Sequence, residues 1–336
     1  MTATLRDVAR AAGVSVATAS RALAHPDMLR AETVARVQAC AQQLDYAPNA
    51  AAVALTTGRN TLLGLVLRSL TNPMFARLAT AIQRHALEED LGLRIVDVAG
   101  TGEDEEAALL ERLSHQETGG IIAVAPQVDD LTLARLSART PLVLVNRQSE
   151  RIPAVILDVP TGIARAIDHL ADLGHTRIAY VSGPIRAWSD ERRRRRVRER
   201  VRLYGMRMDY IGPSPPVFRS GVAAAEQVMR TGATAIVAYN SLIALGVMYR
   251  LAEAGIRVPE DISVVSGDDM ETLGLTCPAV TALHLPIEDA AHTAVRLMRA
   301  VIAGAPAQPK PVTIPVTLIP RESTGQVANG ARAVQT

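Results

Sequence analysis

The beginning of the chain alternates apolar and polar positions with the period of a helix. The apolar stripe consists of Leu5, Val8, Ala9 and Ala12. Thr4 can cap this helix together with Asp7, three residues later, and Gly13 supplies a sharp turn. Ser15 can cap a second helix. The pattern predicts a helix-turn-helix, whose second helix has the diameter to enter a DNA major groove.

Two further helices are predicted before residue 60. The first runs from Ala31 to Leu44, with its apolar stripe at Val34, Val37, Ala41 and Leu44. The second begins at Asn49, a good N-cap, and stops at Gly58. A helix as short as the second one is not stable by itself, so it needs a partner surface.

From Thr61 onward, apolar runs of strand length alternate with helical stretches, one of them near Phe75–Asp90. We expect strands near Leu62–Leu67, Arg94–Val98, Ile121–Ala125, Leu142–Val145, Val155–Leu157, Ile178–Val181, Ala235–Ala238 and Ile262–Val265. This alternation predicts an α/β fold with parallel sheets covered on both faces. A region of about 260 residues forms two similar lobes rather than one sheet. Ligands then bind in the cleft at the carboxyl ends of the strands.

Composition limits the classes of protein and of site. The chain has 336 residues, is 48% hydrophobic and only 3% aromatic, and carries a net charge of +2. Cys40 and Cys277 lie far apart, so neither a disulfide framework nor a zinc site is expected. No apolar run reaches membrane-spanning length and no signal peptide is found, so we expect a cytoplasmic protein. No P-loop, G-x-S-x-G or G-x-G-x-x-G motif occurs, which predicts no enzyme, no cofactor and no metal site.

Positive charge gathers in one segment. Residues 186–207 carry a net charge of +7 and include five consecutive arginines, Arg192 to Arg196. Only Val197, Val201 and Tyr204 form an apolar stripe there. One interpretation is a solvated helix face paired with acids of a neighbouring helix. The other is a strongly positive end of the cleft, which would admit an anionic ligand such as a phosphorylated sugar or a sugar acid.

From Thr4 to Arg21 the chain matches T-x-x-D-V-A-x-x-A-G-V-S-x-x-T-x-S-R at every specified position. This segment resembles the headpiece of the LacI/GalR family of transcriptional regulators. The resemblance implies that the second helix meets DNA through Ser15, Val16, Ala17, Thr18, Ser20 and Arg21. Arg21 suits guanine O6 and N7, whereas Val16 and Ala17 offer apolar contact, for example to a thymine methyl. The short hydroxyls suit phosphates or helix capping equally.

Residues 46–58 read Y-x-P-N-x-x-A-x-x-L-x-x-G, which is similar to the hinge helix of the same family. The resemblance implies DNA contacts from Asn49, Ala52 and Leu55. It also implies that the two Leu55 side chains of a dimer wedge into the minor groove and kink the DNA. Val53 stands where the family usually has a basic residue.

The resemblance continues through Asn72-Pro73-Met74-Phe75 and through residues 173–179, 258–263 and 320–324, and it implies a periplasmic-binding-protein-like core. Phe75 and Arg193 match positions where the family contacts its effector, although core packing is an equal alternative for Phe75. Ser241 stands where the family has an aspartate that accepts sugar hydroxyls. From the residues themselves, two acids and one aromatic can also face the cleft: Asp158 and Asp268, which follow strands, and Trp188, the only tryptophan.

These features predict a homodimeric repressor with a helix-turn-helix headpiece (1–47), a hinge (48–59) and a two-lobed effector-binding and dimerisation domain (60–330). It would bind pseudo-palindromic operator DNA and respond to a small sugar-like effector, neutral or anionic. A periplasmic-type sugar-binding protein without a DNA role is the alternative, but it would lack the headpiece. An enzyme with an α/β core is a more distant one.

Overall fold

The computed structural model describes residues 3–24, 26–46, 61–116, 118–185, 187–269, 276–305 and 310–327. The chain divides into two compact units, Met1–Leu62 and Leu63–Thr336, and each is described by itself. The predicted hinge residues Asn49, Ala52 and Leu55 lie outside the described residues. Among those that are described, no helix combines the length and apolar character needed to span a membrane.

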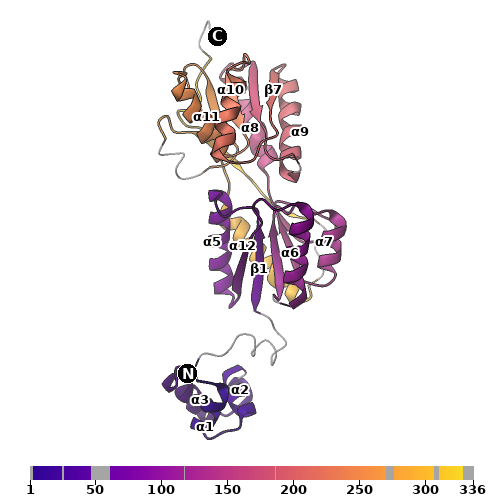
Figure 1. Ribbon diagram of the computed structural model, residues 1–336, viewed down its shortest axis with the longest axis vertical. Coiled ribbons are helices and arrows are strands. Elements are labelled where there is room, and N and C mark those ends of the chain that lie inside the picture. Colours follow the sequence, from indigo (N-terminus) through magenta and orange to yellow (C-terminus); the bar gives the residue numbers. More distant parts are fainter. Residues whose placement is uncertain are drawn as a thin grey trace. The chain divides into compact units, whose positions relative to one another are not determined.

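The first unit is a small helical domain, formed by α1 (Leu5–Ala11), α2 (Val16–Ala24), the 3-10 helix η1 (Pro26–Met28) and α3 (Ala31–Gln43) (Figure 1). Its start is fixed by the predicted cap, because the amide and the hydroxyl of Thr4 both donate to Asp7 Oδ2, at 3.0 and 2.6 Å. Gly13 makes the turn with a φ of +65°, a conformation that favours glycine. The core is small and aliphatic, with Val8, Ala9, Ala12, Ala19, Ala22, Val37 and Ala41.

The second unit consists of two α/β lobes. The first lobe has a six-stranded sheet in the order β11-β5-β4-β3-β1-β2. Its strands are β1 (Leu62–Leu67), β2 (Gly92–Asp97), β3 (Gly120–Val124), β4 (Leu142–Val145), β5 (Ala154–Leu157) and β11 (Val312–Ile314). Its helices are α5 (Pro73–Glu88), α6 (Glu103–Gln116), α7 (Asp130–Ser137) and α12 (Ile287–Ile302). The helices cover both faces of the sheet (Figure 1).

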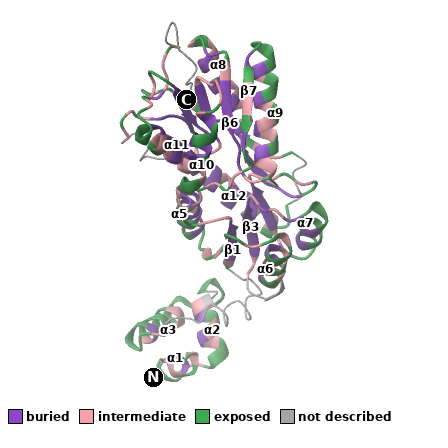
Figure 2. Cartoon of the chain, turned by 45° about the horizontal axis from the view of Figure 1, so that its top comes forward, coloured by how far each residue is buried: buried purple, intermediate pink, exposed green. Residues whose placement is uncertain are grey.

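The second lobe repeats this plan with the strand order β12-β10-β9-β8-β6-β7. Its strands are β6 (Arg177–Val181), β7 (Arg207–Ile211), β8 (Ala235–Ala238), β9 (Ser263–Ser266), β10 (Thr281–His284) and β12 (Thr317–Ile319). Its helices are α8 (Val159–Asp172), α9 (Trp188–Leu203), α10 (Phe218–Val228) and α11 (Ser241–Glu253). In both sheets the central strands are buried, whereas the edge strands and the helices carry exposed positions (Figure 2).

The structure confirms the predicted fold class, and among the strand pairs whose register is described only β10 with β12 is antiparallel. The chain changes lobe after β5, after β10 and after β11. All eight expected strands are present, but β7, β10, β11 and β12 were not predicted. The reason is that β11 and β12 are only three residues long, whereas β7 is an edge strand with exposed polar positions.

Helices α10 and α11 cross with their backbones in contact. A Cβ atom on Gly246 would lie 2.0 Å from the carbonyl oxygen of Phe218, and one on Gly221 would lie 2.1 Å from that of Ile243. Because the obstacles are backbone atoms, a side chain cannot move aside to make room. The two glycines therefore set the distance between these helices.

We predict that Gly246→Ala lowers the free energy of unfolding of the second unit by about 3 kcal/mol, since the helices must separate. Urea denaturation of the purified chain measures this. The control is Gly64→Ala, whose added Cβ would meet its nearest atoms at an ordinary 3.5 Å. Equal stability of the two variants would contradict the close crossing.

His175 is a buried structural residue. Its Nε2 lies 3.2 Å from the carbonyl oxygen of Gly325, which can only accept, so Nε2 carries the proton. Its Nδ1 lies 2.8 Å from the hydroxyl of Thr234. Burial lowers the pKa of His175 to about 4, because the charged form would lose its hydration. The neutral ring thus joins the carboxyl-terminal segment to the sheet of the second lobe.

The lowered pKa predicts a stability that depends on pH. Between pH 6.5 and 4 the unfolded chain protonates this histidine while the folded chain does not, so unfolding becomes easier as the pH falls. The full contribution, about 3 kcal/mol, is present above pH 6.5 and is lost progressively toward pH 4. His175→Asn should flatten this part of the curve of unfolding free energy against pH. Replacing the exposed His284 in the same way should leave the curve unchanged.

Candidate functional site

One candidate surface is the outer face of α2. Val16, Ala17 and Arg21 are exposed, whereas Ala19 and Ala22 on the opposite side are fully buried in the headpiece core. Val16 is 43% exposed, so its apolar side chain is available for contact with a partner surface. The outer face of α2 therefore presents a small apolar surface, formed by Val16 and Ala17, beside Arg21.

The hydroxyl residues of this helix have a local role. Ser15 Oγ accepts a hydrogen bond from the backbone N–H of Thr18 at 3.1 Å, so Ser15 is the expected cap of α2. The two hydroxyls of Ser15 and Thr18 lie 2.8 Å apart. Ser20 is half-buried. The hydroxyls of Ser15 and Thr18 thus shape the helix start, and phosphate contacts from these residues and from Ser20 stay a prediction.

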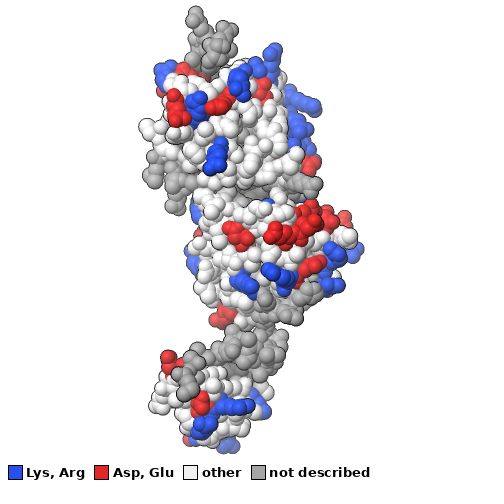
Figure 3. Space-filling view, viewed as in Figure 1, with Lys and Arg blue, Asp and Glu red and all other residues white. Residues whose placement is uncertain are grey.

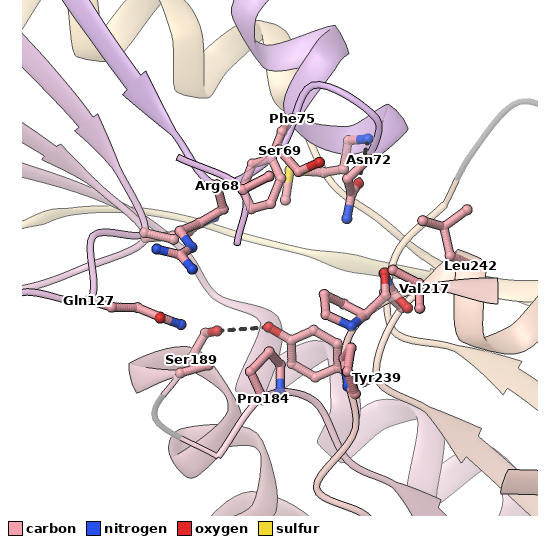
Figure 4. Close-up of a pocket in the computed structure, with 18 of the residues that line it drawn as sticks. Arg68, Ser69, Asn72, Phe75, Gln127, Pro184, Ser189, Val217, Tyr239 and Leu242 are labelled. Carbon is pink, nitrogen blue, oxygen red and sulfur yellow. Dashed lines mark hydrogen bonds between the residues drawn. The ribbon is translucent and has the colours of Figure 1, made fainter. Parts of the chain in front are cut away.

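The second candidate site is a cavity of about 620 Å³ in the second unit. Residues of both lobes line it, and Figure 4 shows Arg68 and Phe75 opposite Ser189 and Tyr239. Many of the lining residues directly follow the carboxyl ends of parallel strands, where ligands of such sheets are expected. The cavity volume is in the range of sites for small organic molecules.

Four of the six effector residues expected from the sequence line this cavity: Phe75, Trp188, Arg193 and Asp268. The other two, Asp158 and Ser241, do not. Asp158 instead caps α8, because its carboxylate accepts from the backbone N–H of Thr161 at 3.3 Å. An acid that follows a strand can either face a ligand or cap the next helix. Here α8 begins directly after Asp158, so its carboxylate caps that helix.

Ser241 lies outside the cavity lining and contacts Asp268, which does line it. Its side chain is fully buried, and its backbone N–H donates to Asp268 Oδ1 at 2.6 Å. Burial raises the pKa of Asp268, while this hydrogen bond and the charge of Arg193 act in the opposite direction. The acidic group that reaches the cavity is therefore Asp268, whereas Ser241 does not line it, and a contact between residue 241 and an effector stays a prediction.

Arg193 holds an aromatic wall of the cavity. Its Nη1 donates to the carbonyl oxygen of Tyr239 at 2.6 Å, and its guanidinium lies 4.3 Å from the centre of the Tyr239 ring. The Tyr239 hydroxyl is 3.2 Å from Ser189 Oγ (Figure 4). The ring also lies over Gly183, where an added Cβ would be 2.5 Å from it. Tyr239 is thus fixed on three sides.

A buried carboxylate that the sequence did not single out holds the neighbouring loop. Asp190 in the first turn of α9 is 0% exposed. It accepts hydrogen bonds from the Tyr180 hydroxyl at 3.0 Å, the Ser182 hydroxyl at 2.8 Å and the Gly183 amide at 3.0 Å. Arg194, four residues later, forms an ion pair with it at 2.9 Å. This cluster fixes the start of α9, where Trp188 and Arg193 face the cavity.

A second buried carboxylate lies behind the opposite wall. Glu106, 1% exposed, pairs with Arg68 at 2.8 Å and accepts a longer hydrogen bond, of 3.3 Å, from the backbone N–H of Gln127. Burial raises the pKa of Glu106, and the charge of Arg68 opposes this. Neither Arg68 nor Gln127 was predicted. The only sequence feature that could have indicated them is their position shortly after the predicted strands Leu62–Leu67 and Ile121–Ala125.

The arginine run spreads around α9 instead of pointing into the cavity. Only Arg193 of the run lines the main cavity. The other four arginines of the run have partners on α9 itself: Arg192 lies over Trp188, Arg194 pairs with Asp190, and Arg195 and Arg196 pair with Glu199. Arg200, farther along the helix, pairs with Asp168 of α8. Figure 3 shows arginines along the outer edge of this lobe. The predicted stripe ends at Val201, because Tyr204 is 43% exposed.

This placement favours the interpretation of a solvated, ion-paired face. The hypothesis of an anionic effector depended on a strongly positive cleft, and the run supplies one cation to it. Both arginines of the lining have a carboxyl group nearby, Glu106 for Arg68 and Asp268 for Arg193. The described residues also contain no group of three or more His, Cys, Asp or Glu suited to a metal ion.

We predict that Asp190→Asn lowers the free energy of unfolding by about 3 kcal/mol, because Arg194 and the loop donors lose their buried charged partner. Denaturant unfolding followed through the fluorescence of Trp188 measures this. The matched control is Glu199→Gln, which removes an exposed carboxylate from the same helix and should cost under about 1 kcal/mol. If both variants lose the same amount, the buried network is not what fixes α9.

Two family models match the chain. Residues 4–49 match the bacterial regulatory proteins of the lacI family, and residues 167–324 match a periplasmic binding protein-like domain. The chain is 31% identical to the HTH-type transcriptional regulator MalR of Streptomyces coelicolor, over 96% of this chain and 97% of that one. It is 29% identical to the ribose operon repressor of Bacillus subtilis, over 96% of this chain and 98% of that one.

Solved structures show the same likeness. The lac repressor dimer bound to operator and the anti-inducer ONPF superposes with a TM-score of 0.86 and 26% identity, over 97% of this chain and 100% of that one. The complex of the transcriptional regulator CelR with cellobiose gives a TM-score of 0.71 and 26% identity, over 96% of this chain and 99% of that one. With the helix-turn-helix, the two-lobed core and relatives that span the whole length, the chain belongs to the LacI family of bacterial transcriptional regulators.

Proposed function

We propose that this regulator is a repressor whose affinity for a pseudo-palindromic operator is controlled by a small sugar-like effector in the cavity between the lobes. The observation that carries the proposal is the lining of that cavity by both lobes. A ligand that contacts both lobes binds one lobe arrangement better than another, and this difference in affinity is what control of a distant site requires.

The outer face of α2 supports the DNA-reading part of the proposal. A homodimer places two copies of this face in successive major grooves, with Arg21 paired to guanine and Val16 and Ala17 against thymine methyls. The lac repressor, which the chain resembles over its whole length, is a dimer on its operator. Asn49, Ala52 and Leu55 complete the DNA surface in this proposal, with the two Leu55 side chains wedged into the minor groove.

The relatives support the effector part. One is named a ribose operon repressor, and another was solved with cellobiose. The cavity of this chain contains two arginines beside carboxyl groups and further polar side chains such as Asn72 and Gln127. Because each of these arginines already has a carboxyl group beside it, a neutral, hydroxyl-rich effector suits the cavity better than an anion. Such a regulator acts where the DNA is, in the bacterial cytoplasm.

We predict that Arg21→Ala reduces the preference for the operator over unrelated DNA by about 1–3 kcal/mol per half-site, because a bidentate base contact is lost. Fluorescence anisotropy with the operator, obtained by sequencing the genomic DNA that the protein protects, measures both affinities. The control is Arg36→Ala, which removes an exposed arginine of α3. It should change both affinities alike, as loss of a phosphate contact does.

The same assay has an outcome against the proposal. If the wild-type protein protects no defined sequence, or if Arg21→Ala keeps the full preference for the operator, α2 is not the helix that reads DNA. In that case the exposed Val16–Arg21 face would need another partner.

A further inference from the structure

The α9 helix and the turn that follows it carry more positive charge than the side chains around them neutralise. Residues 192–207 contain nine arginines and a single acid, Glu199, so their net charge is +8. Four of the arginines contact aromatic or acidic side chains of the second lobe, as described above. Arg195 and Arg196 share the carboxylate of Glu199. Several cations are therefore left for the outer surface of this lobe.

The remaining arginines form one exposed surface. The side chains of Arg198, Arg202 and Arg207 are exposed and have no ion-pair or hydrogen-bond partner in the described part of the chain. Arg195, whose side chain is 70% exposed, precedes Arg198 by three residues, and Arg202 follows by four, so these three lie on one face of α9 over about 10 Å. Arg207 begins the edge strand β7 directly after the turn. We call these four arginines the α9 face, and Figure 3 shows arginines along this outer edge.

Few acids are available to the α9 face within the protein. Glu199 is the shared partner already named, and no acidic residue occurs between residues 200 and 208. On β7, Asp209 pairs with Arg177 at 2.7 Å. Because like charges four residues apart on a helix repel each other, Arg198 and Arg202 oppose the stability of α9 in the free protein. An anionic partner would remove this repulsion.

We propose that the α9 face binds the phosphate backbone of double-stranded DNA, as a second contact besides the headpiece and without preference for sequence. A duplex carries one negative charge per about 1.7 Å of its axis, so a row of arginines over about 10 Å faces several phosphates. Guanidinium groups suit phosphate oxygens in charge and in hydrogen-bond geometry. This inference goes beyond the proposed function, because it depends neither on the operator sequence nor on the effector.

An acidic protein is the other partner that a surface of this charge fits. DNA is favoured because the chain belongs to a family of DNA-binding regulators and its headpiece carries the expected DNA-reading helix. A protein held on DNA by one domain meets a high local concentration of duplex at its other surfaces. A surface that binds duplex only weakly in free solution is then occupied.

The first measurement is the salt dependence of binding to a duplex of unrelated sequence, followed by fluorescence anisotropy with the full chain. The neutral α9 variant, Arg198→Gln/Arg202→Gln/Arg207→Gln, removes three phosphate contacts. Each contact contributes about 0.9 to the slope of log affinity against log salt concentration. The slope should therefore become shallower by about 2 to 3, and the affinity at low salt should fall about tenfold or more.

Two controls separate a site from an effect of net charge. The variant Arg112→Gln/Arg139→Gln/Arg151→Gln removes the same charge from exposed arginines of the first lobe and should leave the slope unchanged. Replacing the three arginines of the α9 variant with lysine keeps their charge and should retain most of the affinity. If the neutral α9 variant and the first-lobe variant lose affinity equally, or if neither loses any, the α9 face is not a DNA site.

The second measurement asks whether the α9 face binds DNA while the headpiece is occupied. Operator duplex on a sensor surface captures the full chain, and the unrelated duplex is then passed over the complex. The wild-type protein should bind this second duplex, whereas the neutral α9 variant should be captured equally well and bind the second duplex about tenfold more weakly or less. If the captured wild-type protein binds no second duplex, the proposal is wrong.

The outcomes distinguish this proposal from its alternatives. If poly-glutamate binds the captured protein more tightly than the duplex does, and the neutral α9 variant loses that binding, the partner is an acidic protein and the DNA contact is wrong. If no DNA sequence captures the protein, the proposed function fails at the headpiece. The salt slopes, which need no operator, still decide in that case whether the α9 face binds DNA.

Discussion

The buried carboxylate of Asp190 is the interaction on which the geometry of the cleft depends. An unpaired charge at 0% exposure would be strongly destabilising, so the fold surrounds it with hydroxyls, an amide and Arg194. These donors come from β6, from the loop after it and from α9. Satisfying one carboxylate therefore fixes the rotation of α9 about its axis. That rotation turns Arg193 toward the cavity and Arg194 away from it.

The headpiece could be read almost completely from the sequence, because its determinants are local. A capping pair at Thr4 and Asp7, a positive φ at Gly13 and a cap at Ser15 each act over three or four residues. The alternation of strands and helices likewise gave the architecture of the core. The strands that escaped prediction, such as β7 and β12, are defined by the neighbour they pair with and not by their own composition.

The cavity could be predicted only in part, because it depends on contacts between distant segments. Phe75 and Arg193 were found through resemblance, and Asp268 through its place after a strand. Asp158 satisfied the same rule and yet caps a helix, since the residues that follow it decide the direction of its side chain. Arg68 and Glu106 are 38 residues apart, and nothing in either local sequence indicates that they form a pair. Such pairs become visible only once the sheet brings them together.

The five consecutive arginines show why the net charge of a sequence segment differs from the charge that lines a nearby cavity. Successive residues of a helix point about 100° apart, so five neighbours are spread around its whole circumference. Asp190 and Glu199 of the same helix then pair with three of them, Arg194, Arg195 and Arg196. The cleft receives one arginine from the run, with an aspartate near it. The selectivity of this regulator for its effector must therefore come from shape, apolar surface and hydrogen bonding more than from net charge.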